Sequence, residues 1–155
     1  MDTSFTPGTT AAVSRVRRQS VGDLLHRTVR RHPDKLAVVA GEQRATYAEF
    51  DAAVNRCAHA LADRGLAKGD RLALLSHNCW QFAVLTYATA RLGVVLVPVN
   101  FMLGAEEIAF ILQHSGARGM VVEDALVPTA EKALASAGVT GGIRGQIGLS
   151  GSGPV

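Results

Sequence analysis

Short apolar runs alternate with longer amphipathic segments in the middle of the chain, and this alternation restricts the fold more than any other feature. Three runs have the length and composition of buried strands: residues 71–75, 94–97 and 120–122. A helix-length segment follows each of them: residues 78–92, 104–116 and 126–137. Strands that alternate with helices in this way pair through right-handed crossovers into a parallel sheet. The sequence therefore predicts an α/β fold, with helices layered on a partial parallel sheet.

Two helices and a hairpin are predicted before this alternation. Ser20 has the residue type of a helix N-cap, and Pro33 stops the helix that it begins. Residues 36–46 contain an apolar run, a turn and a short return, which is typical of a β-hairpin. Thr46 and Glu49 then form a capping-box pattern, so a second amphipathic helix is expected to begin there.

The two ends of the chain differ in composition from its middle. Residues 1–19 are rich in Thr, Ser, Gly and Arg and have no hydrophobic period, as in a loose chain end. Seven of the 16 glycines fall in residues 138–155. We therefore predict a disordered basic arm over residues 1–19, an incomplete α/β domain over 20–137 and an unstructured Gly-rich tail over 138–155.

The net charge of +3 comes from a local excess of arginine. Six arginines and one aspartate lie between residues 13 and 33. A basic segment can meet phosphates or a membrane surface, but no aromatic side chains are interleaved with these arginines as in single-strand binders. We interpret the segment as a solvated helix face and expect no nucleic-acid partner.

Cysteine spacing and hydropathy point to a cytoplasmic protein. Cys57 and Cys79 lie in apolar helical patterns and form no CxxC motif, which favours two buried thiols in a reducing compartment over a disulfide or a zinc site. The first twenty residues contain no secretory signal. Residues 82–99 are the most apolar segment, but Arg, Gly and Pro interrupt it, so no transmembrane segment is expected.

Ser76, His77 and Asn78 form a polar set after the first predicted parallel strand. Ligands of open α/β sheets bind at the carboxyl ends of the strands, so His77 is a candidate general base or ligand contact. The alternative is that Asn78 caps the next helix and His77 is a surface loop residue. We favour this second interpretation.

Other polar patterns offer less chemistry. Pro98 is expected to mark the exit of the second parallel strand, with Asn100 in the turn after it and no catalytic role for either. The paired carboxylates, Glu106 with Glu107 and Glu123 with Asp124, face no acid–base partner that the sequence reveals.

Residues 150–154 (SGSGP) form a glycine cluster that lacks the lysine and the following helix of a phosphate loop. The sequence therefore assigns no catalytic, cofactor-binding or metal-ligating residue.

Several short motifs, in this order and spacing, carry a resemblance to a known family. They are residues 46–50 (TYAEF), 55–56 (NR), 65–71 (GLAKGDR) and 91–100 (RLGVVLVPVN). Together they resemble the N-terminal portion of the AMP-forming acyl-CoA synthetases, which are adenylate-forming ligases. The resemblance covers roughly residues 20–137 and implies the first α/β layer of the large N-terminal domain of that family.

Members of this family activate a carboxylic acid with Mg-ATP to an acyl-adenylate and pass the acyl group to coenzyme A. The resemblance thus implies ATP, Mg and coenzyme A as cofactors of the complete enzyme, and a fatty or other hydrophobic acid as its substrate. The nucleotide loop, the other catalytic motifs and the C-terminal lysine of the family have no counterpart in these residues, so we expect no cofactor to bind this chain. It is expected to be an N-terminal fragment, truncated before the ATP-binding loop and inactive alone.

Two other functions remain open at this stage. In the first, the chain would be an interaction or dimerisation module whose apolar faces pair with another copy or with the missing remainder of the enzyme. Alternatively, it is a small nucleotide-binding protein of the flavodoxin-like type, which would bind ATP, AMP or flavin.

Overall fold

The computed structural model describes residues 20–139 and 142–148. The helices are α2 (Val21–Arg31), α3 (Tyr47–Asp63), α4 (Trp80–Leu92), α5 (Ala105–Ser115) and α6 (Val127–Ser136), with a 3-10 turn η1 (Asp124–Leu126) before α6. The strands are β1 (Leu36–Ala40), β2 (Gln43–Thr46), β3 (Arg71–Leu75), β4 (Val95–Val99), β5 (Gly119–Glu123) and β6 (Ile143–Ile147).

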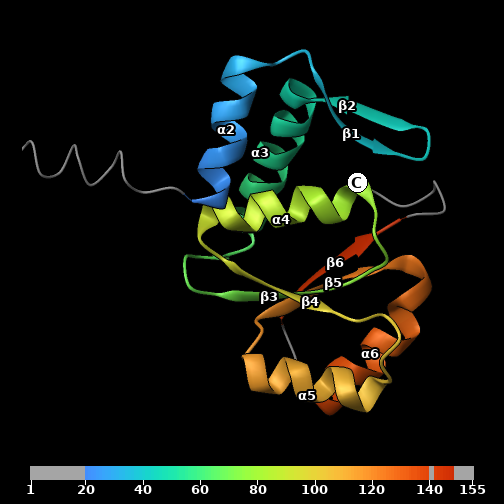
Figure 1. The fold of residues 1–155 in the computed structure, drawn as a ribbon. Helices are drawn as coiled ribbons and strands as arrows, with labels where there is room; N and C mark the ends of the chain where they lie inside the picture. The colour runs from blue at the N-terminus through green and yellow to red at the C-terminus, as the bar shows by residue number, and fades with distance from the viewer. Residues whose placement is uncertain (1–19, 140–141, 149–155) are drawn as a thin grey trace, which may run out of the picture.

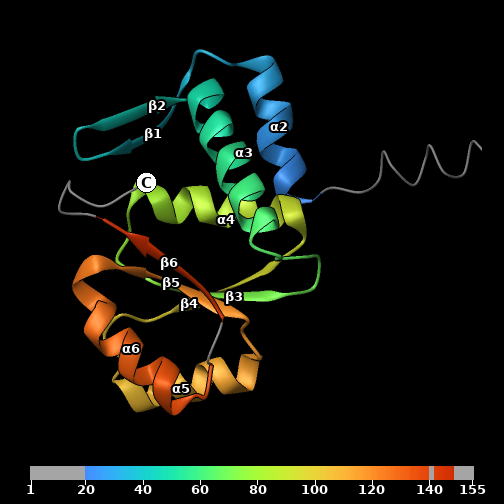
Figure 2. The same cartoon turned by 180° about the vertical axis from the view of Figure 1, so that it is seen from behind.

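The predicted α/β fold is confirmed, because β3, β4, β5 and β6 form a parallel sheet in the order β4-β3-β5-β6. Helix α4 covers one face of this sheet, and α5 and α6 cover the other (Figure 1). Helices α2 and α3 form a further layer outside α4, beside the antiparallel hairpin of β1 and β2 (Figure 2).

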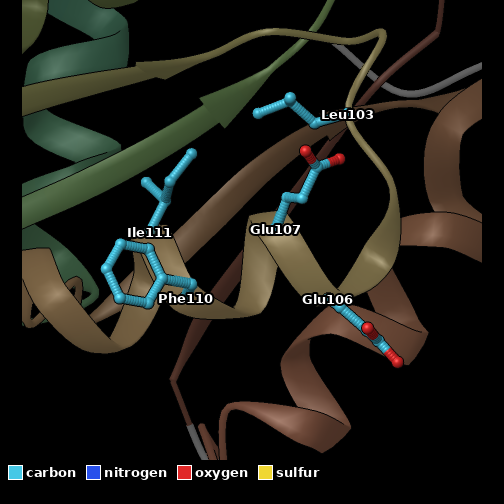
Figure 3. Close-up of a pocket in the computed structure, with 5 residues that line it drawn as sticks. All are labelled: Leu103, Glu106, Glu107, Phe110 and Ile111. Carbon is cyan, nitrogen blue, oxygen red and sulfur yellow. The ribbon is translucent and has the colours of Figure 1, made fainter.

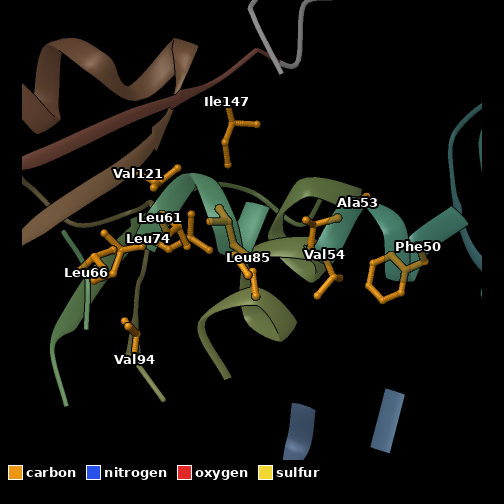
Figure 4. Close-up of a cluster of buried hydrophobic side chains, with 14 of the residues drawn as sticks. Phe50, Ala53, Val54, Leu61, Leu66, Leu74, Leu85, Val94, Val121 and Ile147 are labelled. Carbon is orange, nitrogen blue, oxygen red and sulfur yellow. The ribbon is translucent and has the colours of Figure 1, made fainter. Parts of the chain in front are cut away.

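Strand β3 is the centre of the core because its alternate side chains serve both faces of the sheet. Leu72 and Leu74 belong to a cluster shared with α3 and α4, part of which is drawn in Figure 4. Ala73 and Leu75 belong to a second cluster, shared with α5 and α6. All four side chains are at most 1% exposed. The predicted buried strand at residues 71–75 is therefore confirmed. The same prediction for residues 94–97 is wrong, because they contribute to the edge strand β4, where Val95 is 52% exposed.

The predicted helix starts are confirmed where local side chains determine them. The Ser20 hydroxyl accepts a hydrogen bond from the Asp23 amide at 3.2 Å, and the Asp23 carboxylate accepts one from the Ser20 amide. Thr46 and Glu49 make the same reciprocal pair at the start of α3. These hydrogen bonds hold the pKa of both acids below its ordinary value.

The start of α4 differs from the sequence-based expectation. Cys79, not Asn78, is the N-cap, and its Sγ accepts a hydrogen bond from the Phe82 amide at 3.4 Å. Both cysteines are free and half-buried, and burial raises the pKa of the Cys57 thiol. A raised pKa leaves little reactive thiolate at neutral pH.

The prediction for residues 138–155 is wrong where the chain forms β6. This strand pairs in parallel with β5 from Gly119 opposite Ile143 to Glu123 opposite Ile147. Ile147 is buried in the α4-side cluster. The glycine content of residues 138–155 concealed the strand, because glycine is depleted in strands. The pairing also depends on a glycine of β5, since a Cβ on Gly119 would lie 2.1 Å from the Ile143 carbonyl oxygen. The predicted arm at residues 1–19 lies outside the described residues.

Pro98 lies inside β4, not at its exit as predicted. Strand β4 is an edge of the sheet, and Val95 is 52% exposed. The Val95 amide donates to the Asp70 carbonyl on the β3 side, so by alternation the nitrogen of Pro98 faces away from β3. A proline is compatible with an edge strand at such a position, because no ladder hydrogen bond is lost there.

None of the helices in the described part of the chain is long and apolar enough to cross a membrane.

Candidate functional site

The strongest candidate site lies at the carboxyl ends of β3 and β5. These two strands are neighbours, but the chain leaves β3 for α4 on one face of the sheet and leaves β5 for α6 on the other. A crevice opens at such a reversal in α/β folds and is where their ligands bind. Ser76 and His77 follow β3, and Glu123 is the last residue of β5.

One carboxylate oxygen ties the two strand ends together. Glu123 Oε2 accepts hydrogen bonds from the His77 amide at 2.8 Å and from His77 Nδ1 at 2.9 Å. The Ser76 hydroxyl lies 3.3 Å from the same oxygen and 2.9 Å from the His77 carbonyl oxygen, to which it donates. Glu123 and Ser76 are only 6% and 5% exposed. The buried acid is therefore satisfied by one short segment of the neighbouring strand.

The environment of Glu123 has two opposing effects on its pKa. Burial alone would raise it, because a desolvated carboxyl group favours the neutral form. The hydrogen bonds from the amide and ring of His77, its charge and the Ser76 hydroxyl act the other way, and the net result is a pKa below the ordinary value for glutamate. The acid is thus held as a carboxylate at neutral pH.

The imidazole of His77 is oriented from two directions. Glu123 holds Nδ1, and the Phe101 ring, from the loop after β4, lies with its centroid 3.8 Å from the imidazole centroid at 35° between the planes. The His77 side chain is 47% exposed. In the neutral form of the ring, Nδ1 donates to the carboxylate and Nε2 is the acceptor; in the charged form, both nitrogens are donors.

In its neutral form, the imidazole offers a proton-accepting nitrogen at the edge of the sheet, but within residues 20–139 and 142–148 no hydroxyl or thiol is hydrogen-bonded to it. The Ser76 hydroxyl is buried and donates to the backbone. The hollow lined by Leu103, Glu107 and Ile111 does not include His77 or Glu123. The geometry therefore supports a structural link between the ends of β3 and β5 better than an acid–base centre.

The sequence predicted part of this site. His77 is a half-exposed loop residue, as favoured, and it is the partner of Glu123 that the sequence did not reveal. That partner was missed because 46 residues separate the two side chains. The usable signal was the position of both at the ends of adjacent parallel strands. Nothing in the sequence pattern identified Phe101.

The other predicted polar sets take structural roles where they are described. Asn100 Oδ1 accepts from the Met102 amide at 3.0 Å, which is the expected turn. Glu107 accepts from the Gly104 amide at 2.9 Å and caps α5. Residues 150–154 lie outside the described residues.

Similarity to known proteins agrees with the fold. A family profile described as "AMP-binding enzyme" matches residues 25–146. The chain belongs to this family. Within the family it is 42% identical over 105 residues to the long-chain-fatty-acid–CoA ligase FadD13 of Mycobacterium tuberculosis, covering 68% of this chain and 21% of that protein. It is also 41% identical over 100 residues to the fatty acid–[acyl-carrier-protein] ligase ScoC of Streptomyces coeruleorubidus, covering 64% and 19%.

Solved structures of AMP-binding enzymes place the same residues in the same fold. The N-terminal domain of FACL13 from M. tuberculosis, solved with an inhibitor, matches with a TM-score of 0.78 at 35% identity, covering 86% of this chain and 34% of that one. A putative long-chain-fatty-acid CoA ligase from Rhodopseudomonas palustris matches with a TM-score of 0.79 at 33% identity, covering 90% and 35%. The chain spans about a fifth of the length of the curated relatives.

Proposed function

We propose that this chain is the N-terminal α/β segment of an acyl-CoA ligase. The activity of the complete enzyme would be ATP-dependent activation of a fatty or other hydrophobic carboxylic acid to an acyl-adenylate and then to acyl-CoA. The observation that carries this proposal is the 42% identity to FadD13, a protein named as a long-chain-fatty-acid–CoA ligase. In that enzyme, this segment would act as a structural scaffold, which consists of the sheet β4-β3-β5-β6 and its helices.

The described residues offer no preformed site for the Mg or the nucleotide of such a ligase. Over residues 20–139 and 142–148, no group of three or more His, Cys, Asp or Glu side chains could hold a metal ion. In an α/β sheet of this topology, a nucleotide would be expected between the carboxyl ends of β3 and β5. In this chain, His77 and Glu123 bridge that place. We therefore assign ATP, Mg and coenzyme A to the complete enzyme and derive no catalytic step for these residues.

The test of inactivity is an ATP–pyrophosphate exchange assay on the purified 155-residue chain with Mg and a panel of fatty acids. We expect no exchange above the blank. Measurable turnover would overturn the assignment of the chain as a scaffold.

A chimera tests the ligase assignment independently. The 105 matched residues of FadD13 are replaced by those of this chain, and acyl-CoA formation is measured. We expect activity to be retained, since the two segments share their fold and 42% of their residues. The control is the same chimera with Leu74→Ala, which damages the core at β3. A chimera that folds but forms no acyl-adenylate would contradict the proposal.

The strand order gives a specific reason to test nucleotide binding as a second function. In the order β4-β3-β5-β6, the topology reverses between β3 and β5, which are the first and third parallel strands along the chain. Flavodoxin-like sheets reverse at the same place. A thermal-shift assay with millimolar ATP, AMP or flavin mononucleotide measures binding directly. We expect no shift, because the His77–Glu123 pair occupies the place of a ligand; a clear stabilisation would favour the nucleotide-binding alternative.

A further inference from the structure

Two exposed surfaces of the molecule have opposite charge and each combines that charge with apolar side chains. The first is the α5 groove, a hollow of about 490 Å³ lined by Leu103, Glu106, Glu107, Phe110 and Ile111. In Figure 3, Glu107 and Ile111 rise from α5 toward the strands, with Phe110 beside them. Phe110 is 66% exposed, so the groove presents a large apolar surface to solvent beside its two carboxylates.

The second surface is the basic face of α2, formed by Val21, Leu24, Arg27, Arg30 and Arg31. Val21 and Leu24 are each 50% exposed, one turn apart at the start of the helix. The three arginines follow in its last two turns and together line a second hollow. Among the described residues, the ion pairs are His77–Glu123, Arg91–Asp51 and Arg118–Asp70, so none of them includes these arginines. Arg27 acts on Asp23 of the same helix only as a nearby charge.

The two surfaces are complementary when their helices run antiparallel. Along α2 the order is apolar and then basic, whereas along α5 it is acidic, at Glu106 and Glu107, and then apolar. An antiparallel alignment therefore places Leu24 near Phe110 and Arg30 near Glu106. It also places the basic end of one helix at the acidic start of the other, where charges of these signs favour each other.

A single molecule cannot make this contact, since α2 and α5 lie on opposite sides of the sheet (Figure 1). We propose that the α5 groove binds the basic face of α2 from a second copy of this chain. The contact is heterologous, so each copy retains one free surface of each kind and association continues head to tail. This inference does not depend on the ligase function proposed above.

The contact is expected to be weak and sensitive to salt. One pair of short helices buries less than the roughly 800 Å² per partner of a stable complex. Its charged rim is solvent-exposed, so salt screens the attraction. In sedimentation velocity of the 155-residue chain, the mean sedimentation coefficient should rise with protein concentration at low salt and fall back when salt is added.

Two charge variants test the pairing. The first is Glu106→Lys with Glu107→Gln, in which glutamine keeps the cap on Gly104 while the charge is removed. The second is Arg27→Glu with Arg30→Glu. Each variant alone brings like charges together, and we expect its association to weaken by roughly tenfold or more.

The mixture of the two variants gives the decisive result. In an equimolar mixture, every contact between unlike variants again joins opposite charges, so association should return although neither variant associates alone. This recovery also excludes misfolding as the cause of the loss. Glu131→Lys on α6 is the control for net charge and should associate like the natural chain.

A strictly monomeric natural chain at low salt over the whole concentration range would overturn the proposal. So would an associating chain whose variants associate equally well, or a mixture of variants that stays monomeric. The last two results would point to a different surface or to another partner for the α5 groove.

Discussion

The His77–Glu123 pair shows how one buried acid can join two distant parts of the chain. Its hydrogen bonds are charge-assisted, and hydrogen bonds to charged groups contribute about 1.5–3 kcal/mol each. Because burial opposes the charge, the net stabilisation is smaller than their sum. We therefore expect Glu123→Gln, which keeps an acceptor but removes the charge, to lower the free energy of unfolding at pH 7 by about 1–3 kcal/mol, measured by urea denaturation.

The pH dependence of stability gives a second measurement on the same variant. The pKa of Glu123 is lower in the folded chain than in the unfolded one, so its contribution is complete above the unfolded value, about 4.3, and is lost as the pH falls through the lower, folded value. Glu123→Gln should thus flatten the loss of stability in acid. The matched control is Glu131→Gln, an exposed glutamate of α6. An unchanged acid slope in Glu123→Gln would contradict the lowered pKa.

At the scale of elements, strand β6 depends on the absence of a side chain at Gly119. We expect Gly119→Ala to separate β6 from β5, because its Cβ would lie 2.1 Å from the Ile143 carbonyl oxygen. The cost should reach the upper part of the common range, about 3 kcal/mol. Hydrogen exchange should show lost protection across Ile143–Ile147.

Gly145→Ala is the control for this prediction. The nearest atoms to its Cβ would all belong to the Val121 side chain, the closest being a methyl group at 3.2 Å, and a side chain can adjust. Equal exchange in the two variants would mean that the close approach at Gly119 does not hold β6 in place.

The contrast between β3 and β6 explains how far the sequence determines this fold. Residues 72–75 form a short apolar run after a polar turn, and Thr46 with Glu49 caps α3 locally, so pattern alone predicts both. Strand β6 and the partner of Glu123 depend on contacts across the sheet that no local pattern encodes. Cys79, not Asn78, caps α4 because the helix begins at Trp80, one residue later than predicted. Both residue types can accept the capping hydrogen bond.

For the whole molecule, β3 contributes side chains to both hydrophobic clusters, and we expect the two clusters to unfold as one cooperative unit. Leu74 and Leu75 face opposite clusters, and each is at most 1% exposed. We expect Leu74→Ala and Leu75→Ala each to cost about 2–5 kcal/mol and to lower the midpoint of a single thermal transition. Val95→Ala, at a half-exposed edge position, should cost less. Two separate transitions in either leucine variant, followed by circular dichroism, would show that the clusters unfold independently.

The two edge strands of the sheet, β4 and β6, differ in the hydrogen-bonding groups that they present outward. On the β4 side, Pro98 turns a nitrogen without hydrogen outward, so a strand arriving there finds one donor missing. On the β6 side, the amide of Ile143 points to Arg118, which by alternation leaves Arg144 and Gln146 with outward donors and acceptors. Pro98 therefore disfavours pairing of another strand with β4, as in amyloid-like stacking or domain swapping. An added strand would pair more readily with β6.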